Sequence, residues 1–230
     1  MSRRSIDEAI VAPRPRPPVA VAAVAVAGCP PSGGAWEAAG KESAVVLVGD
    51  FMCPSAVSIL DELRGRGIEV YAVTGRRDDT FIADLVASHA SLIDGRLVEL
   101  GGGVYLAGVG GREPLMNIER LSTGLGSLPP GATVVLASYY PPHGVLDSSR
   151  LGPGRGLYEL RALVGRLPAG VRVVVAASDC GPRGAIAPLA GRRGYTVCLH
   201  SIAEGGGCVH LLGAAEPPAR SCSGGAGYHD

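Results

Sequence analysis

The stretch from Ala44 to Cys53 reads AVVLVGDFMC and decides how the rest of the chain is interpreted. Its first five residues are all apolar, without polar alternation, which is typical of a strand buried on both faces of a sheet. The Gly-Asp pair that follows places a carboxylate just beyond the carboxyl end of that strand. Open α/β sheets carry their chemistry on such loops, so Asp50 is the first candidate functional residue.

Similar apolar runs recur along the chain and alternate with amphipathic segments. The runs predict buried strands, and the segments between them predict helices, one beginning after Pro54 and one capped by Thr80. Alternation of this kind predicts an α/β fold. We expect strands at Val19–Ala27, Ala44–Val48, Glu69–Val73, Val104–Val109, Thr133–Ala137 and Val171–Ala176, and helices at Ser55–Arg66, Phe81–Ser88 and Leu157–Leu167.

Length and composition bound the fold and its surroundings. The 230 residues, 47% of them hydrophobic, suit one folded domain at 19–213, with loosely attached tails at 1–18 and 214–230. A formal net charge of zero gives no overall attraction to nucleic acid or to a membrane surface, and Val19–Ala27 is too short to span a bilayer. The six cysteines include no CxxC pair, so we expect reduced thiols in the cytoplasm.

Three further loops after predicted strands carry polar candidates: Gly75–Asp79 (GRRDD), Ser138–Gly144 (SYYPPHG) and Ala177–Gly184 (ASDCGPRG). With Gly28–Pro31 and Gly49–Cys53 before them, their order and spacing resemble the motifs of the calcineurin-like metallophosphoesterases. The resemblance implies an α/β/β/α sandwich, in which two mixed sheets lie face to face and are flanked by helices. It also led us to expect the strands at Val104–Val109 and Val171–Ala176 to meet across the core.

Nearly every metal-ligand position of that family carries a residue here that cannot bind metal. The family holds two metal ions with carboxylates, an amide and imidazoles, and the ions activate water. The resemblance keeps Asp50 as the bridging carboxylate and Asp78 as the last residue of the third motif. The other positions hold Gly28, Pro30, Arg76, Arg77, Tyr139, Ser178 and Cys180. One carboxylate cannot hold two hard cations, so we expect no dinuclear metal and no cofactor.

The resemblance therefore implies a catalytically inactive protein, retained to bind a partner protein or an anionic ligand such as a phosphate or a nucleotide. Two alternatives stay open: a metal-dependent phosphoesterase with a rearranged site around Asp50, Asp78 and His143, and a noncatalytic subunit of a larger assembly. The resemblance places the remnant cleft at Asp50, Arg76, Arg77, Asp78, Tyr139, His143 and Ser178.

Arg76 and Arg77 have two possible uses in such a cleft. They can pair with a carboxylate of the emptied site, or they can bind an anionic ligand directly, as arginine forks bind phosphate. A buried carboxylate without metal needs a cation or several donors, so we expect Asp50 to pair with Arg76 or Arg77. Breaking a buried pair of this kind costs about 3–5 kcal/mol.

Two C-x-H pairs near the C-terminus form a separate candidate metal site. Strands at Tyr195–His200 and Cys208–Leu212 would pair through the glycine-rich turn at Glu204–Gly207, with two thiols and two imidazoles on one face. Zinc takes such ligands, but the spacing matches no known finger, and a partly buried polar strand face explains it equally. The four residues are Cys198, His200, Cys208 and His210.

Overall fold

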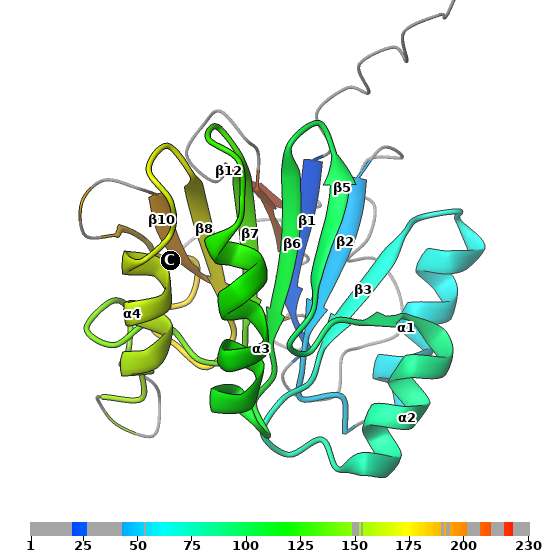
Figure 1. Cartoon of the computed structure of the whole chain (residues 1–230). Helices are drawn as coiled ribbons and strands as arrows, with labels where there is room; N and C mark the ends of the chain where they lie inside the picture. The colour runs from blue at the N-terminus through cyan, green and yellow to red at the C-terminus, as the bar shows by residue number, and fades with distance from the viewer. Residues whose placement is uncertain are drawn as a thin grey trace, which may run out of the picture.

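The computed structural model describes residues 20–26, 43–52, 54–148, 152, 154–189, 191, 194–201, 208–212 and 219–222. Within these ranges the chain forms two six-stranded sheets and four helices, so the predicted α/β fold is confirmed (Figure 1). Each sheet joins parallel strands in its middle to antiparallel strands toward an edge. No helix of the described chain is long and apolar enough to cross a membrane.

The first sheet has the order β12-β11-β1-β2-β3-β4, in which β1 to β4 run parallel. Its strands are β1 (Ala20–Ala25), β2 (Ser43–Val48), β3 (Val70–Val73), β4 (Ser91–Leu92), β11 (Cys208–Leu212) and β12 (Ala219–Cys222). The second sheet has the order β5-β6-β7-β8-β10-β9, in which β6, β7, β8 and β10 run parallel. Its strands are β5 (Leu97–Gly101), β6 (Val104–Val109), β7 (Thr133–Ser138), β8 (Arg172–Ala177), β9 (Ile186–Pro188) and β10 (Gly194–Cys198).

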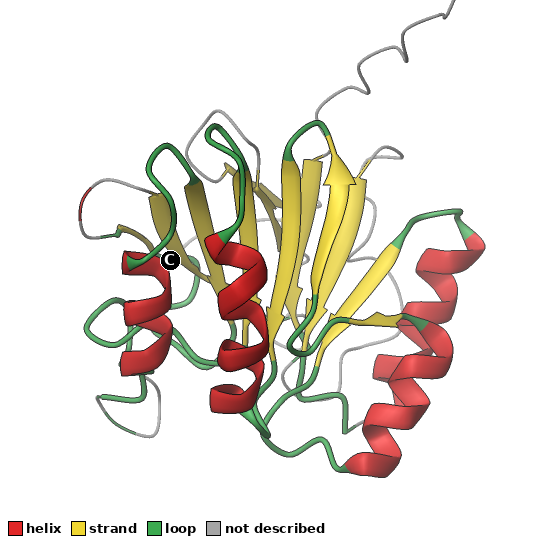
Figure 2. Cartoon of the chain, in the orientation of Figure 1, coloured by secondary structure: helices red, strands yellow, loops and turns green. Residues whose placement is uncertain are grey.

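One hydrophobic cluster joins the two sheets. It takes alternate residues from β1, β2 and β3 of the first sheet and from β6, β7 and β8 of the second, among them Val46, Tyr71, Leu106 and Val135. Successive side chains of a strand point to opposite faces, so the remaining apolar residues face outward. Helices α1 (Pro54–Gly65) and α2 (Thr80–His89) cover the outer face of the first sheet. Helices α3 (Pro114–Gly126) and α4 (Tyr158–Gly165) cover that of the second (Figure 2).

The six strands and three helices predicted from the sequence are present, with ends within two residues of those expected. Asp79 rather than Thr80 caps α2, because its Oδ1 accepts a hydrogen bond of 2.9 Å from the Ile82 N–H. Helix α3 was not predicted. Its buried Ile118, Leu121 and Leu125 have helical spacing, but glycines late in the segment weaken the pattern.

Three expectations about strand placement are corrected. Strands β6 and β8 lie on either side of β7 in one sheet, so they do not meet across the core. The predicted hairpin between Tyr195–His200 and Cys208–Leu212 is wrong, because β10 pairs with β8 and β9 whereas β11 belongs to the other sheet. Ala219–Cys222, expected in a loose tail, forms β12 beside β11. The predicted N-terminal tail lies outside the described residues.

Candidate functional site

The candidate site lies where the carboxyl ends of the parallel strands of the two sheets come together. A hydrogen bond of 2.8 Å from the Gly111 N–H to the Thr74 carbonyl joins the loops after β3 and β6. A second, of 3.1 Å from Ser178 Oγ to the Gly49 carbonyl, joins the loops after β8 and β2. The loops that hold the sequence candidates are therefore tied to one another across the two sheets.

Asp50 is held by three donors of the protein. Its Oδ2 accepts from Arg77 Nε at 2.9 Å and from the Tyr139 hydroxyl at 3.2 Å, while its Oδ1 accepts from the Arg77 N–H at 3.0 Å. The expected pairing of Asp50 with an arginine is thus present, with Arg77 as the partner. The Asp50 side chain is 4% exposed and that of Arg77 is 59% exposed, so the ion pair has one buried and one solvated end.

Asp78 is completely buried and joins two loops, and it forms no ion pair with the described residues. Its Oδ1 accepts from the Phe51 N–H and its Oδ2 from the Gly75 N–H, each at 2.6 Å. Burial raises the pKa of Asp78, and the two backbone donors oppose that rise. Both oxygens are occupied within the protein, so Asp78 holds the loops after β2 and β3 in place rather than facing a ligand.

The close approach of these loops depends on glycine. A Cβ at Gly75 would overlap the Asp50 carboxylate, and a Cβ at Gly49 would overlap Asp78 and the Gly75 backbone. Only a residue without a side chain fits at either position. The Gly-Asp and Gly-Arg-Arg-Asp segments therefore work as one unit in which each glycine makes room for the carboxylate of the other loop.

Tyr139 and Tyr140 line the site from the end of β7. Their rings meet edge to face, with centroids 4.9 Å apart. Burial raises the pKa of both hydroxyls, and nearby Asp50 raises that of Tyr139 further. The positive charge of the exposed Arg76 lowers the pKa of Tyr140 and so opposes the effect of burial.

Ser178 and Asp179 reach the site from the end of β8. Ser178 is almost fully buried and donates to the Gly49 carbonyl, so it fastens the backbone beside Asp50. Asp179 accepts from Arg155 Nη1 at 3.1 Å, and its own N–H donates to the Tyr139 carbonyl at 2.7 Å. The hydrogen bonds thus bring together five of the seven sequence candidates, Asp50, Arg77, Asp78, Tyr139 and Ser178, and the charge of Arg76 reaches Tyr140 beside them.

His143 is the candidate that the described contacts do not connect to Asp50. Its ring stacks on Tyr158 of α4 with centroids 3.7 Å apart, and its Nδ1 lies 3.5 Å from Asp147 Oδ2. The Arg161 guanidinium donates to its backbone carbonyl at 3.2 Å. These contacts fasten the loop after β7 to the start of α4, which is a structural role.

Asp94 is a partly buried carboxylate near the site that the sequence did not reveal as a candidate. It accepts from the Thr74 N–H at 3.1 Å and from the Thr74 hydroxyl, and burial raises its pKa. It thereby fixes the backbone at the end of β3, just before Gly75. Its sequence signal is weak, because an Asp-Gly pair before a strand reads as an ordinary turn.

The donor set around Asp50 does not fit the dinuclear metal site of the metallophosphoesterases. Both oxygens of Asp50 accept hydrogen bonds, from Arg77 and Tyr139. The Ser178 hydroxyl donates to a carbonyl, and Cys180 forms a disulfide with Cys198. Within the described residues no three His, Cys, Asp or Glu side chains group as metal ligands. The candidate positions Gly28 and Pro30 lie outside the described residues.

The structure does not bring the four expected zinc ligands together on one hairpin. Cys198 is bonded to Cys180, and the backbone of Cys208–Leu212 belongs to the other sheet, so the four expected ligands do not share a hairpin face. The expectation of reduced thiols is also wrong for this cysteine pair.

Comparison of the chain with protein-family models, with curated proteins and with solved structures found no match.

Proposed function

We propose that this chain is a non-hydrolytic protein with a metallophosphoesterase-like α/β/β/α sandwich, and that it binds a phosphate-like anion at the edge formed by Arg76 and Arg77. The sandwich is supported by the hydrophobic cluster that takes side chains from both sheets and by the helix pairs packed on their outer faces. The order of the loops at the carboxyl edge supports the family resemblance.

The proposal rests on one observation: both carboxylate oxygens of Asp50 already accept hydrogen bonds from the protein. Hydrolysis in the family needs a carboxylate that bridges two metal ions, and the ions supply the attacking water. Here the same carboxylate is the buried end of an ion pair and also accepts from a phenol and a backbone N–H. To bind metal, Asp50 would have to break these hydrogen bonds. The Arg77 guanidinium would then be left without its partner, next to a metal cation. The arginine therefore replaces the positive charge that metal ions provide in the family.

Part of the Arg77 guanidinium is available to bind an anion from solution. Its Nε is bonded to Asp50, while the side chain is 59% exposed, so the outer edge of the guanidinium faces solvent. The hydrogen bond to Asp50 raises the pKa of Arg77, which keeps it charged. Arg76 next to it is exposed and makes no ion pair within the described chain. Two permanently charged guanidinium groups suit the planar, bidentate recognition of phosphate-like anions.

The structure gives less support to the other candidate functions. A rearranged hydrolase would need Asp78 or His143 to reach a substrate, but Asp78 is completely buried on two backbone donors and His143 is stacked on Tyr158. Among the described residues, no particular contact favours a role as a noncatalytic subunit or binding to a partner protein. We therefore take the anion as the proposed ligand.

The proposal is tested by measuring metal content, turnover and anion binding on one preparation. We expect no Asp50-dependent pair of metal ions and no hydrolysis of an aryl phosphate with added Mn²⁺. Calorimetry with inorganic phosphate should show binding that Arg76→Gln weakens about tenfold, the loss of one good charge-assisted hydrogen bond. Arg172→Gln is the matched control, because Arg172 is exposed at the opposite, amino end of β8. Two bound metal ions that disappear in Asp50→Ala, or equal phosphate affinity in Arg76→Gln and Arg172→Gln, would refute it.

A further inference from the structure

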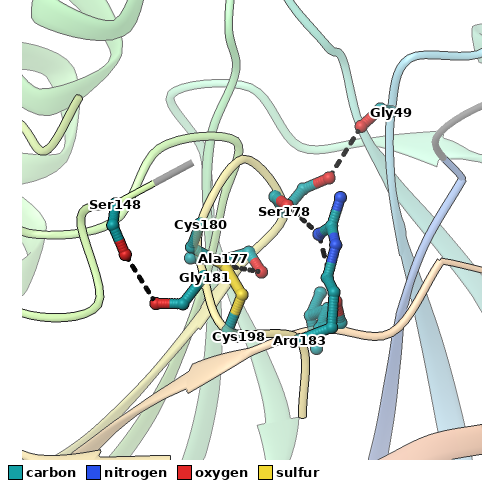
Figure 3. Close-up of a disulfide and its surroundings, with 9 residues drawn as sticks. Gly49, Ser148, Ala177, Ser178, Cys180, Gly181, Arg183 and Cys198 are labelled. Atoms are coloured by element: carbon teal, nitrogen blue, oxygen red, sulfur yellow. Dashed lines mark hydrogen bonds between the residues drawn. A yellow bond between two sulfur atoms is a disulfide. The ribbon is translucent and has the colours of Figure 1, made fainter. Parts of the chain in front are cut away.

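A disulfide joins the loop after β8 to the end of β10. Cys180 lies in the loop and is 5% exposed, while Cys198 is the last residue of β10 and is fully buried. Figure 3 shows the bond between Cys180, in the loop that also carries Ser178, and Cys198 at the end of β10. The two cysteines are 18 positions apart in the sequence, so the bond closes the segment that contains β9 into one covalent loop.

The clamped loop is also the part of the second sheet that holds the candidate site together. Ser178 donates to the Gly49 carbonyl beside Asp50 (Figure 3). The Asp179 N–H donates to the Tyr139 carbonyl. Arg183, at the far end of the loop, donates to the carbonyls of Ser178 and Leu199. Each of these bonds requires the loop to stay at one position over the ends of β8 and β10.

Two hydrogen bonds of the described residues reach Gly181 on the outer side of the loop. Ser148 Oγ donates to the Gly181 carbonyl at 3.2 Å, and the Gly181 N–H donates to the Leu146 carbonyl at 3.2 Å. The small apolar cluster beneath the loop consists of Ala177, the two cysteines and the partly buried Leu146. Toward β10, the Gly184 N–H donates to the Cys198 carbonyl at 2.8 Å and the Cys198 N–H donates to the Ala185 carbonyl at 2.9 Å. These bonds act at the far end of the loop, and the disulfide adds a covalent restraint at Cys180, next to Ser178 and Asp179.

We propose that the Cys180–Cys198 disulfide is a redox-dependent clamp on the candidate site, so that the site is fully ordered only in the oxidised protein. This rests in part on the proposed function, since the consequence for anion binding assumes that the Arg76–Arg77 edge is the binding site. In the reduced protein the loop is held only by its hydrogen bonds. Without the covalent restraint, Ser178 and Asp179 hold Gly49 and Tyr139 less firmly, and through them Asp50 and Arg77.

The oxidation step is a thiol–disulfide exchange with a small disulfide such as oxidised glutathione. One cysteine thiolate attacks the glutathione disulfide, which gives a mixed disulfide and releases one glutathione thiol. The second cysteine thiolate then attacks the protein sulfur of the mixed disulfide and releases the second glutathione thiol. The protein loses two electrons and two protons, and one oxidised glutathione becomes two reduced molecules. Because both sulfurs are buried in the folded protein, reduction requires the loop to open.

The experiment compares the oxidised protein with the variant Cys180→Ala/Cys198→Ala and with Val164→Ala. Val164 is buried in α4 on the outer face of the second sheet, so its truncation controls for general loss of stability. A digest without reductant must first yield a peptide in which Cys180 and Cys198 are linked. Unlinked peptides from protein purified without reductant would overturn the proposal.

Hydrogen exchange of the loop amides from Asp179 to Gly184 is the readout that does not depend on a ligand. We expect at least tenfold faster exchange in the double-cysteine variant and exchange close to the wild type in Val164→Ala. Calorimetry with inorganic phosphate should show at least tenfold weaker binding in the double-cysteine variant only. Unchanged loop exchange overturns the clamp. If the oxidised protein binds no phosphate, the proposed function fails, and the loop exchange alone decides the clamp.

Discussion

Asp50 and Asp78 are two buried carboxylates at the same edge of the molecule, and they are stabilised in different ways. Asp78 accepts from two uncharged backbone N–H groups, and both donors are as buried as the carboxylate. Asp50 accepts from a guanidinium whose side chain is 59% exposed, and from a phenol and one N–H. When Asp78 is removed, its two N–H donors have no access to water. When Asp50 is removed, its main donor, the Arg77 guanidinium, does have access to water.

This difference changes the energy expected for the loss of Asp50. The sequence led us to expect about 3–5 kcal/mol, because a guanidinium would be stranded in a buried site. The structure places most of the Arg77 side chain in solvent, so it can be hydrated once its partner is gone. The buried partner of this pair is the carboxylate, so loss of the arginine should be more harmful than loss of the aspartate.

The largest effect is expected for Asp78→Ala. The substitution leaves the N–H groups of Phe51 and Gly75 buried without an acceptor, at about 1–3 kcal/mol each. The free energy of unfolding should fall by about 3–5 kcal/mol in urea denaturation. Asp79→Ala is the matched control, because the neighbouring aspartate is exposed and only caps α2, which is worth about 1 kcal/mol. Equal losses for the two variants would contradict the structural role of Asp78.

Arg77→Ala should be the second largest effect. It leaves the Asp50 carboxylate buried with only Tyr139 and a backbone N–H, and an uncompensated buried charge of this kind costs about 3 kcal/mol. Asp50→Ala should cost less, about 1–2 kcal/mol, because the guanidinium turns to water. The double variant Asp50→Ala/Arg77→Ala should be close to Asp50→Ala alone, since the stranded charge is gone. Additive losses in this cycle would show that the two side chains do not act as a pair.

The parallel strands and the pairing of Asp50 could be predicted from the sequence. The valine-rich runs placed the parallel strands, and the Gly-Asp and Gly-Arg-Arg-Asp loops at their ends predicted that Asp50 pairs with an arginine. These features are local, or follow from the rule that parallel strands end at the same edge. The burial of Asp78 was not predictable, because it depends on how closely two glycines allow the loops to approach.

Features that depend on the assignment of strands to sheets were missed. Cys198 and Cys208 were placed on one hairpin because they are near in sequence and separated by glycines. The structure assigns their strands to different sheets and brings Cys198 beside Cys180 instead. Local turn chemistry gives no information on which sheet a strand joins, since that choice is made by the packing of the whole core.

Tyr139→Phe should have a smaller effect than either charge variant. It removes the weakest of the three donors to Asp50, at 3.2 Å, while the ring stays in place against Tyr140. We expect a loss of about 0.5–1.5 kcal/mol in the free energy of unfolding, the usual value of one hydrogen bond. Tyr140→Phe is the control, because no hydrogen bond of its hydroxyl is seen in the described part of the chain. A larger loss for Tyr140→Phe would show that the phenol of Tyr139 does not help to hold Asp50.

The smallest effect is a dependence on pH that distinguishes Asp78 from a residue that does not titrate. Burial raises the pKa of Asp78 above its ordinary value of 3.8, so the unfolded chain ionises at lower pH than the folded protein. Below pH 3.8, Asp78 is protonated in both the folded and the unfolded state, and its full contribution to the free energy of unfolding is present. As the pH rises from 3.8 through the raised pKa, the folded state loses stability by up to about 1.4 kcal/mol per pH unit. Asp78→Asn has no such titration at this position. The stability advantage of the wild type over Asp78→Asn should therefore shrink across this window and stay constant at higher pH. Urea denaturation of both proteins between about pH 3.5 and pH 7 measures it, and an advantage that grows with pH would show that the backbone donors outweigh burial at Asp78.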